Sequence, residues 1–320
     1  MPSRLRRVGV IAPRVVPRFS APLLSPRVLM PRYLSGSSAT LPLTAWGSAT
    51  EMALSRASAS NMDIFTNCML GGVLLGLGGV GVYVTVCGGS PALEASSPGV
   101  HRLLGAMVFP GGLALISTTG AGIVTASFLL SAIPLLTHPG HAAANVKNAL
   151  RFVGMSLAGS FVGAVGCAAF LASAGVIKRD TPAASWACRL AKAKCDLSFG
   201  TAFFKAIACN FLVTTAIVLG SNQTSPGAKT AAVYLPIAVF VLLGLEHSVA
   251  NMTLLPLAYF LGADIGPSDI AGNLLPVTLG NWLGALCLLA VNAKILPPAR
   301  AAPLTLATAW QGRKAIASDF

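Results

Sequence analysis

The chain has 320 residues, of which 54% are hydrophobic and only 10% are charged, and its mean hydropathy is +0.74. A soluble domain carries about a quarter charged residues, so this composition excludes an ordinary soluble protein and predicts a surface covered largely by lipid. Seven arginines precede Glu51, and without them the net charge of +13 falls to about +6. Because no basic surface interleaved with aromatic residues is present, nucleic acid is not a predicted partner.

Residues 1–58 combine many arginines and serines with several prolines and a single acid. Transit peptides are rich in arginine and serine and poor in acids. The string RYLS at residues 32–35 also resembles an arginine-directed cleavage site. We therefore predict that residues 1–58 are a disordered organellar presequence outside the fold. The alternative is a disordered basic tail without a targeting role.

Six apolar stretches follow, each long enough to cross about 30 Å of hydrocarbon. They are 64–87, 103–136, 149–177, 199–219, 233–260 and 274–296. They predict a transmembrane domain over 59–297 and a tail over 298–320. The most charged connector, 178–196, contains Cys188 and Cys195, which could pair. No Cys/His cluster has the spacing of a metal site, so neither a metal nor a cofactor is predicted.

The second and fifth stretches are too long for one simple crossing. The second contains the helix-weak run STTGAG at 117–122, and the fifth contains Glu246-His247-Ser248 and later Pro256. Broken helices at corresponding places in two halves are typical of an inverted repeat with its site at the membrane midplane. Non-helical backbone at that depth is tolerated only inside protein or beside a cavity. We predict an all-α membrane protein with six transmembrane helices in an inverted 3+3 repeat and a pore between the two breaks.

Glu246 and His247 are the adjacent ionisable pair deep within an apolar stretch. A charge at such a depth costs about 2.5 kcal/mol or more, so both residues are candidates for a functional site. Each also has a structural alternative, since Glu246 could pin a helix by accepting backbone hydrogen bonds and His247 could be a satisfied core residue. Lys205, just inside the fourth stretch, either snorkels to the interface or lines the mouth of the pore.

Five segments resemble the formate/nitrite transporter family. They are FPGGL at 109–113, GAGIVT at 120–125, CNFLV at 209–213, GLEHSVANM at 244–252 and NLLPVTLGN at 273–281. Together the resemblance spans about residues 62–296. It implies an aquaporin-like six-helix protomer, a homopentamer in the lipid bilayer, and one pore per protomer for small monovalent anions.

The resemblance also implies individual roles. His247 matches the central pore histidine, and Thr125 matches the threonine that hydrogen-bonds it. The other matches are Phe109 and Phe240 as the aromatic members of two constrictions, Leu113 and Ile123 as aliphatic members, Lys194 as the vestibule lysine and Asn210 as a pore-wall asparagine. In this interpretation Lys194, with Lys192 and Arg189 nearby, concentrates anions at one mouth. The apolar constrictions exclude hydrated ions, and His247 either donates a hydrogen bond or passes a proton.

Two positions depart from the family pattern. Gly122 stands where an acid is usual and is followed by Ile123 and Val124, and Ser160 stands where asparagine is frequent. An acid and an aromatic residue are therefore lost beside the break. This leaves a second hypothesis open, a structural or regulatory family member that has lost transport.

An enzyme is not predicted, because the chain offers no nucleotide-binding loop, metal cluster or nucleophile with a base. Among members of the family, the segments around residues 97–110 and 245–252 look most like algal plastid proteins that handle nitrite or bicarbonate. Combined with the presequence, this favours the chloroplast envelope, with the mitochondrial inner membrane as the alternative.

Overall fold

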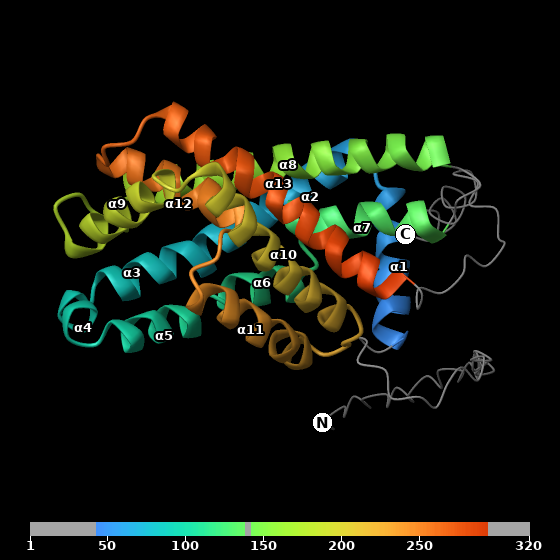
Figure 1. The fold of residues 1–320 in the computed structure, drawn as a ribbon, viewed down its shortest axis with the longest axis horizontal. Helices are drawn as coiled ribbons and strands as arrows, with labels where there is room; N and C mark the ends of the chain where they lie inside the picture. Colours follow the sequence, from blue (N-terminus) through green and yellow to red (C-terminus); the bar gives the residue numbers. More distant parts are fainter. Residues whose placement is uncertain (1–42, 138–141, 294–320) are drawn as a thin grey trace, which may run out of the picture. The chain divides into compact units, whose positions relative to one another are not determined.

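The computed structural model describes residues 43–137 and 142–293, which contain helices and connecting turns and no strand (Figure 1). The elements are α1 (Leu43–Ala57), α2 (Asn61–Leu75), the π-helix η1 (Gly76–Gly81), α3 (Val82–Gly88), α4 (Pro91–Ser96), α5 (Pro98–Val108), α6 (Gly111–Thr119), α7 (Val124–Thr137), α8 (Ala142–Ser173), α9 (Pro182–Cys195), α10 (Phe199–Ser221), α11 (Pro226–Leu242), α12 (Ser248–Leu261) and α13 (Pro267–Asn292). The predicted presequence up to residue 42 and the predicted tail at 298–320 lie outside the described residues.

Five helical segments in the described part of the chain are long and apolar enough to cross a membrane. They are Asn61–Gly88, Pro98–Thr119, Ala143–Ser173, Phe199–Ser221 and Pro267–Asn292. The remaining predicted crossing is divided between two shorter apolar helices, α11 and α12. The second predicted stretch likewise continues past its long segment into α7. The prediction of an all-helical membrane protein is confirmed.

Both predicted breaks are present. The second stretch is interrupted at residues 120–123, where Gly120 ends α6 at a φ of +76°. The fifth is interrupted at residues 243–247, where Gly244 has a φ of +64°. Glycine takes these left-handed conformations without the penalty that a Cβ would bring. Pro256, which follows this break in the sequence, lies inside α12 and does not end the helix.

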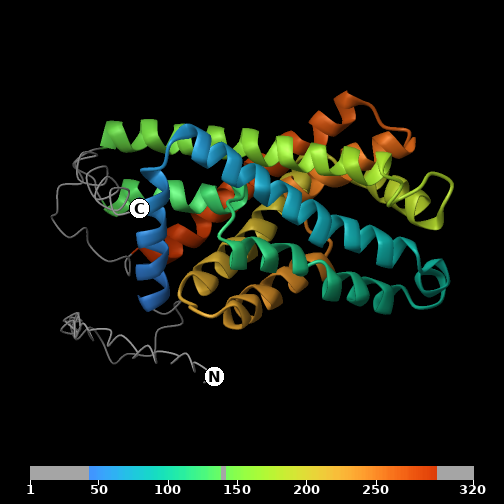
Figure 2. The same ribbon diagram turned by 180° about the vertical axis from the view of Figure 1, so that it is seen from behind.

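The packing of the helices follows an internal symmetry. In the first half α2 lies along α8, and in the second half α10 lies along α13 (Figures 1 and 2). The helices that follow the two breaks then cross over, because α7 packs against α13 and α12 packs against α8. Each half thereby inserts one short helix against the last long helix of the other half. This is the arrangement expected of an inverted 3+3 repeat with broken second and fifth helices.

The prediction that residues up to 58 are disordered is wrong for residues 43–57, which form α1. This helix packs against α7 and α10, and the Trp46 side chain is fully buried. Ala45, Ala49 and Ala53 are also buried, and their spacing of four places them on one helical face. A face of small residues gives little hydropathy signal, which explains why the serine-rich composition resembled a presequence here.

The charged connector 178–196, expected as a polar loop, contains the helix α9. Thr181 begins this helix as its N-cap, because its side chain accepts a hydrogen bond from the Ala184 backbone N–H. Cys188 and Cys195 are both free thiols on this one helix. Seven residues of helix separate them by roughly 10 Å, too far for a disulfide. Burial raises the pKa of Cys195 to about 11, so the thiol stays protonated at neutral pH.

Candidate functional site

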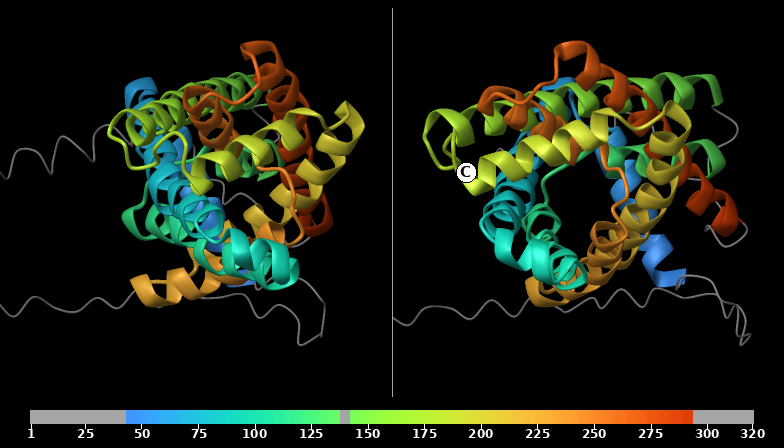
Figure 3. Two further views of the ribbon diagram at one scale, coloured as in Figure 1. Left: turned by 90° about the vertical axis from the view of Figure 1, so that its left-hand side faces the viewer. Right: turned by 60° about the vertical axis from the view of Figure 1, so that its left-hand side comes forward.

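A cavity of about 490 Å³ borders the second break, where Gly244, Glu246 and His247 belong to its lining. Its lining comes from η1, α3, α5, α9, α10, α11 and α12, and Figure 3 shows the arrangement of the helices in two further views. Its lining includes Phe109, Phe240 and His247. Thr125, Leu113 and Ile123 do not line it. The cavity therefore gives access to one side of the predicted pore centre.

His247 is the N-cap of α12 and is almost fully buried, with 4% of its surface exposed. Its Nδ1 accepts a hydrogen bond from the Ala250 backbone N–H at 3.1 Å. A neutral imidazole that accepts at Nδ1 carries its proton on Nε2. The Nε2–H therefore donates to Thr125 Oγ1, 3.2 Å away across the two breaks. The Thr125 hydroxyl keeps its own hydrogen available for another acceptor.

Two phenylalanine rings stand in front of the histidine. The Phe240 ring stacks on the imidazole of His247, with centroids 5.7 Å apart and planes at 14°. The Phe109 ring meets Phe240 edge to face, with centroids 5.6 Å apart. Both phenylalanines are buried. They line the cavity together with His247, so two apolar rings border the imidazole there.

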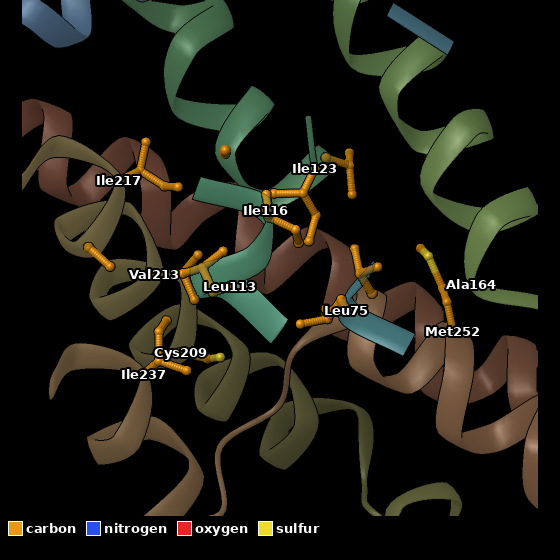
Figure 4. Packing of buried hydrophobic residues seen from close by; sticks show 14 of the residues in the cluster. Leu75, Leu113, Ile116, Ile123, Ala164, Cys209, Val213, Ile217, Ile237 and Met252 are labelled. Atoms are coloured by element: carbon orange, nitrogen blue, oxygen red, sulfur yellow. The ribbon is translucent and has the colours of Figure 1, made fainter. Parts of the chain in front are cut away.

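Leu113 and Ile123 come from α6 and from the residue just before α7. Both belong to the buried hydrophobic cluster drawn in Figure 4, and neither lines the cavity. Ile123 is two residues before Thr125 in the chain, and both Leu113 and Ile123 are buried.

Lys194 does not stand free in the vestibule. Its Nζ lies 2.7 Å from Glu246 Oε1 in a salt bridge, and its side chain is only 16% exposed. The other carboxylate oxygen of Glu246 accepts from Asn251 Nδ2 at 2.7 Å. Asn251 also donates to Asn273 Oδ1, and Asn273 donates back to the Lys194 carbonyl. The Glu246 carboxylate is therefore held by side chains, and it accepts no backbone hydrogen bond within the described residues.

The neighbouring cations named with Lys194 are also paired. Arg189 forms a salt bridge with Glu94 at 2.8 Å, and Lys192 pairs with Asp196. Both pairs are substantially exposed to solvent. These three cations therefore contribute less positive potential at the mouth than the sequence alone indicated.

Asn210 acts as a bridge between helices. Its Nδ2 donates to the Asn281 carbonyl at 2.6 Å and to the Thr125 carbonyl at 3.2 Å. Asn281 in turn accepts from the Ser248 N–H and donates to the carbonyls of Glu246 and Ala206. Neither asparagine lines the cavity. Together they fix the start of α7 and of α12 relative to α10 and α13.

The first break is fixed by its own set of contacts. Gly122 N–H donates to Asn67 of α2, and Val124 N–H donates to the hydroxyl of Ser160. Arg56 of α1 donates to the carbonyls of Gly120 and Ala121 at 3.3 and 3.4 Å. These carbonyls follow the end of α6, where backbone acceptors need partners from outside the helix.

Close packing explains why position 122 is a glycine. A Cβ there would lie 2.7 Å from Cys68 Sγ of α2 and 3.5 Å from Arg56 Nη1. A Cβ on Gly71 of α2 would in turn overlap the Gly122 carbonyl oxygen. The break and α2 are therefore packed backbone to backbone, which leaves no room for the acid that is usual at position 122.

Sequence reasoning missed Arg56, Asn251, Asn273 and Asn281 as parts of the site. The three asparagines lie in the motifs quoted above, and a polar residue inside an apolar span is itself a signal. Arg56 gave no such signal, because it lay within the segment assigned to the presequence.

Comparison with known proteins agrees with this geometry. The sequence pattern of the formate/nitrite transporters matches residues 45–293. The chain belongs to the formate/nitrite transporter family. The match begins at residue 45, so the family pattern includes most of α1. Members of this family are transporters and channels, in agreement with the prediction that the protein is not an enzyme.

Several curated relatives are similar over most of their length. A probable formate transporter of Methanothermobacter thermautotrophicus is 31% identical over 67% of this chain and 81% of its own length. The formate channel BtFdhC of Bacillus thuringiensis is 30% identical over 67% of this chain and 79% of its own. An uncharacterized transporter of Bacillus subtilis, YrhG, is 31% identical over 67% and 77%.

Two solved structures share the fold. A channel described as an FNT family ion channel superposes with a TM-score of 0.67 at 24% identity, covering 79% of this chain and 99% of its own. A pentameric formate channel with formate bound superposes with a TM-score of 0.62 at 26% identity, covering 72% and 95%. The aquaporin-like, multi-pass fold is thereby established.

Proposed function

We propose that this protein conducts small monovalent anions of the formate, nitrite and bicarbonate class through a pore centred on His247 and Thr125. The observation that carries the proposal is the meeting of the two breaks, where the His247 imidazole contacts the Thr125 hydroxyl at 3.2 Å. Two short helices, α7 and α12, begin at this point, and helix N-termini favour negative charge. The family match and the formate-bound structure support the class of substrate.

The proposed path begins in the cavity and passes Phe109 and Phe240 to reach His247. An anion loses water at the aromatic pair, and desolvation of a bare ion costs several kcal/mol. Hydrogen bonds from the Thr125 hydroxyl and the imidazole offset part of that cost. Leu113 and Ile123 form the apolar barrier on the far side, so that bulk water does not fill the path.

Of the two roles considered for His247, we propose the hydrogen-bond donor. Protonation at Nδ1 would set two donors against each other, because the Ala250 N–H already points at that nitrogen at 3.1 Å. The neutral tautomer keeps both contacts. Proton transfer to the anion remains the alternative role, and it predicts flux that depends steeply on external pH.

We further propose that the protomer assembles as a homopentamer in an organellar membrane. A solved pentameric formate channel of the same fold supports the assembly. The arginine-rich, acid-poor residues 1–42 support an organelle, with the chloroplast envelope favoured over the mitochondrial inner membrane and nitrite or bicarbonate favoured as the plastid substrate. Import of the full chain fused to a fluorescent protein tests the location, and native mass spectrometry tests the assembly.

The second candidate function is a structural or regulatory member without transport, favoured by the glycine at position 122. One experiment separates the two candidates. Purified protein in liposomes is offered formate, nitrite and bicarbonate side by side, with the His247→Asn variant as the matched control. Flux above that of empty liposomes supports the channel, whereas a correctly assembled pentamer without flux for any of the three supports the structural role.

A further inference from the structure

The wall of the cavity carries an excess of positive charge. Its charged lining residues are Arg102, Lys194, Lys205 and Glu246. Lys194 is bound to Glu246 at 2.7 Å, so these two charges neutralise each other. The positive potential of the cavity therefore comes from Arg102 and Lys205.

Neither of these two cations forms a salt bridge in the part of the chain that the structure describes. The salt bridges within 43–137 and 142–293 join Arg189, Lys192 and Lys194 to acids, and none includes Arg102 or Lys205. Arg102 lies on α5 of the first half and is exposed, whereas Lys205 lies on α10 of the second half and is half-buried. The cavity wall thus receives one free cation from each half of the repeat.

The position of Lys205 is energetically unfavourable for a charged side chain. It is six residues beyond the start of α10, roughly 9 Å along the helix axis. An unpaired ammonium at such a depth in a transmembrane helix is unfavourable and by default indicates a functional site. Lys205 borders the cavity, which decides between the two roles that the sequence left open for it.

A hydroxyl lies on the same wall. Tyr83 of α3 lines the cavity, and its ring packs edge to face against Phe109 with centroids 5.9 Å apart. Its hydroxyl makes no hydrogen bond in the described part of the chain, although its ring is fixed between Phe109 and Trp186. A rigid phenol of this kind is a ready donor to an oxygen of an anion.

We propose that Arg102, Lys205 and the Tyr83 hydroxyl form a capture site for small carboxylates and oxyanions on the cavity wall, which an anion meets before it passes Phe109 and Phe240. The site rests on the proposed function, because it holds the anion that the pore then conducts. Clefts lined by one sign of charge concentrate the opposite ion locally. Capture therefore sets the substrate concentration at which flux is half-maximal, and the His247–Thr125 centre sets the flux at saturation.

Concentration-dependent formate flux into liposomes at low ionic strength tests the site. In the double variant Arg102→Gln/Lys205→Gln the half-saturating formate concentration should rise on the order of tenfold, with the saturated flux retained. The matched control Lys147→Gln/Lys229→Gln removes the same net charge away from the cavity and should keep the wild-type value. Tyr83→Phe, which preserves the ring packing, should give a smaller rise. An unchanged half-saturating concentration in the double variant would overturn the proposal.

A second measurement does not depend on conduction. Formate is titrated against the detergent-solubilised pentamer at constant ionic strength, and the rise in melting temperature reports binding to the folded state. The double variant should need about tenfold more formate than the wild type for the same rise. If wild-type liposomes show no flux but this difference persists, the capture site stands and the proposed conduction fails. Equal formate dependence in the double variant and the control contradicts the site whatever the flux.

Discussion

The imidazole of His247 is occupied at both ring nitrogens. Nδ1 caps the first turn of α12 by accepting from Ala250 N–H, and Nε2 reaches Thr125. The residue is therefore part of the helix start as well as part of the pore centre. A substitution can remove one of these functions and retain the other, because the two contacts lie on opposite sides of the ring.

We predict that His247→Asn folds with nearly wild-type stability and loses normal conduction. Asparagine is a strongly preferred N-cap, so its Oδ1 can replace Nδ1 as the acceptor from Ala250 N–H. It cannot reach Thr125 in the same way as Nε2. His247→Ala should in addition lose about 1 kcal/mol of stability, because the cap is gone. Melting temperature and anion flux across a range of pH separate the two effects; unchanged flux and pH profile in an assembled His247→Asn pentamer would contradict the pore assignment.

Lys194 has a different role from the one implied by its resemblance to the vestibule lysine. It neutralises Glu246, whose side chain is only 2% exposed, at the second break. Removal of one partner of a buried pair leaves the other charge without compensation. The effect should therefore fall on the folding of the break more than on the local concentration of anions.

We predict that Lys194→Met lowers stability by about 2–4 kcal/mol and reduces flux equally at low and high salt. The double variant Lys194→Met/Glu246→Gln should recover part of the stability, because the buried carboxylate is then neutral and its amide can still contact Asn251. Thermal unfolding in detergent and flux at two ionic strengths test this. A loss of flux confined to low salt would instead restore the role of Lys194 in anion attraction.

At the scale of elements, α1 connects the N-terminal region to the first break. Its buried face contacts α7 and α10, and Arg56 near its end donates to Gly120 and Ala121 of the break. Arg151 of α8 donates to the carbonyl of Ala57, the last residue of α1, and to the carbonyl of Ala59 just after the helix. The helix is thus anchored at its face and at its C-terminal end.

We predict that a truncation beginning at residue 43 assembles as a pentamer and conducts, whereas one beginning at residue 59 does not. The second truncation removes α1, including Trp46, and so exposes the surfaces of α7 and α10 against which this helix packs. Trp46→Ala should cost about 3–5 kcal/mol, as for other fully buried large side chains. Size-exclusion chromatography and melting temperature report both results. Normal assembly of the chain beginning at residue 59 would mean that the folded domain begins there, as the sequence analysis predicts.

At the scale of the whole molecule, the parts that could be predicted from the sequence are those carried by local chemistry. The apolar stretches, the helix-weak run before Gly122 and the ionisable pair Glu246–His247 indicated the spans and both breaks. The contacts between distant segments could not be predicted in this way. Lys194 and Glu246 are 52 residues apart, and nothing local indicates that they meet. The alanine face of α1 was missed because packing of small residues leaves almost no hydropathy pattern.

The two halves fix their breaks with related but unequal contacts, and this inequality leads to the last prediction. Ser160 of α8 accepts from the first N–H of α7, and Asn281 of α13 accepts from the first N–H of α12. Asn281 makes two further hydrogen bonds, to the carbonyls of Ala206 and Glu246, whereas Ser160 makes none in the part of the chain that the structure describes. The side chain of Asn281 therefore holds the second break, which carries the histidine, through more contacts than the side chain of Ser160 makes at the first.

We predict that Asn281→Ser, which gives the second half the residue type of the first, is more harmful than Ser160→Ala. The serine leaves the Glu246 carbonyl in the break without its partner, at about 1–3 kcal/mol, and also removes the contact between α13 and the Ala206 carbonyl of α10, whereas Ser160→Ala removes one acceptor from one N–H. With Glu246 less firmly held, the adjacent His247 should lose its alignment with Thr125, so flux should fall together with the melting temperature. Both variants are compared in liposomes and in detergent, with Ser248→Ala as a control that leaves the backbone contact to Asn281 in place. Equal losses for Asn281→Ser and Ser160→Ala would mean that the two halves are held alike and that the extra contacts of Asn281 do not fix the pore centre.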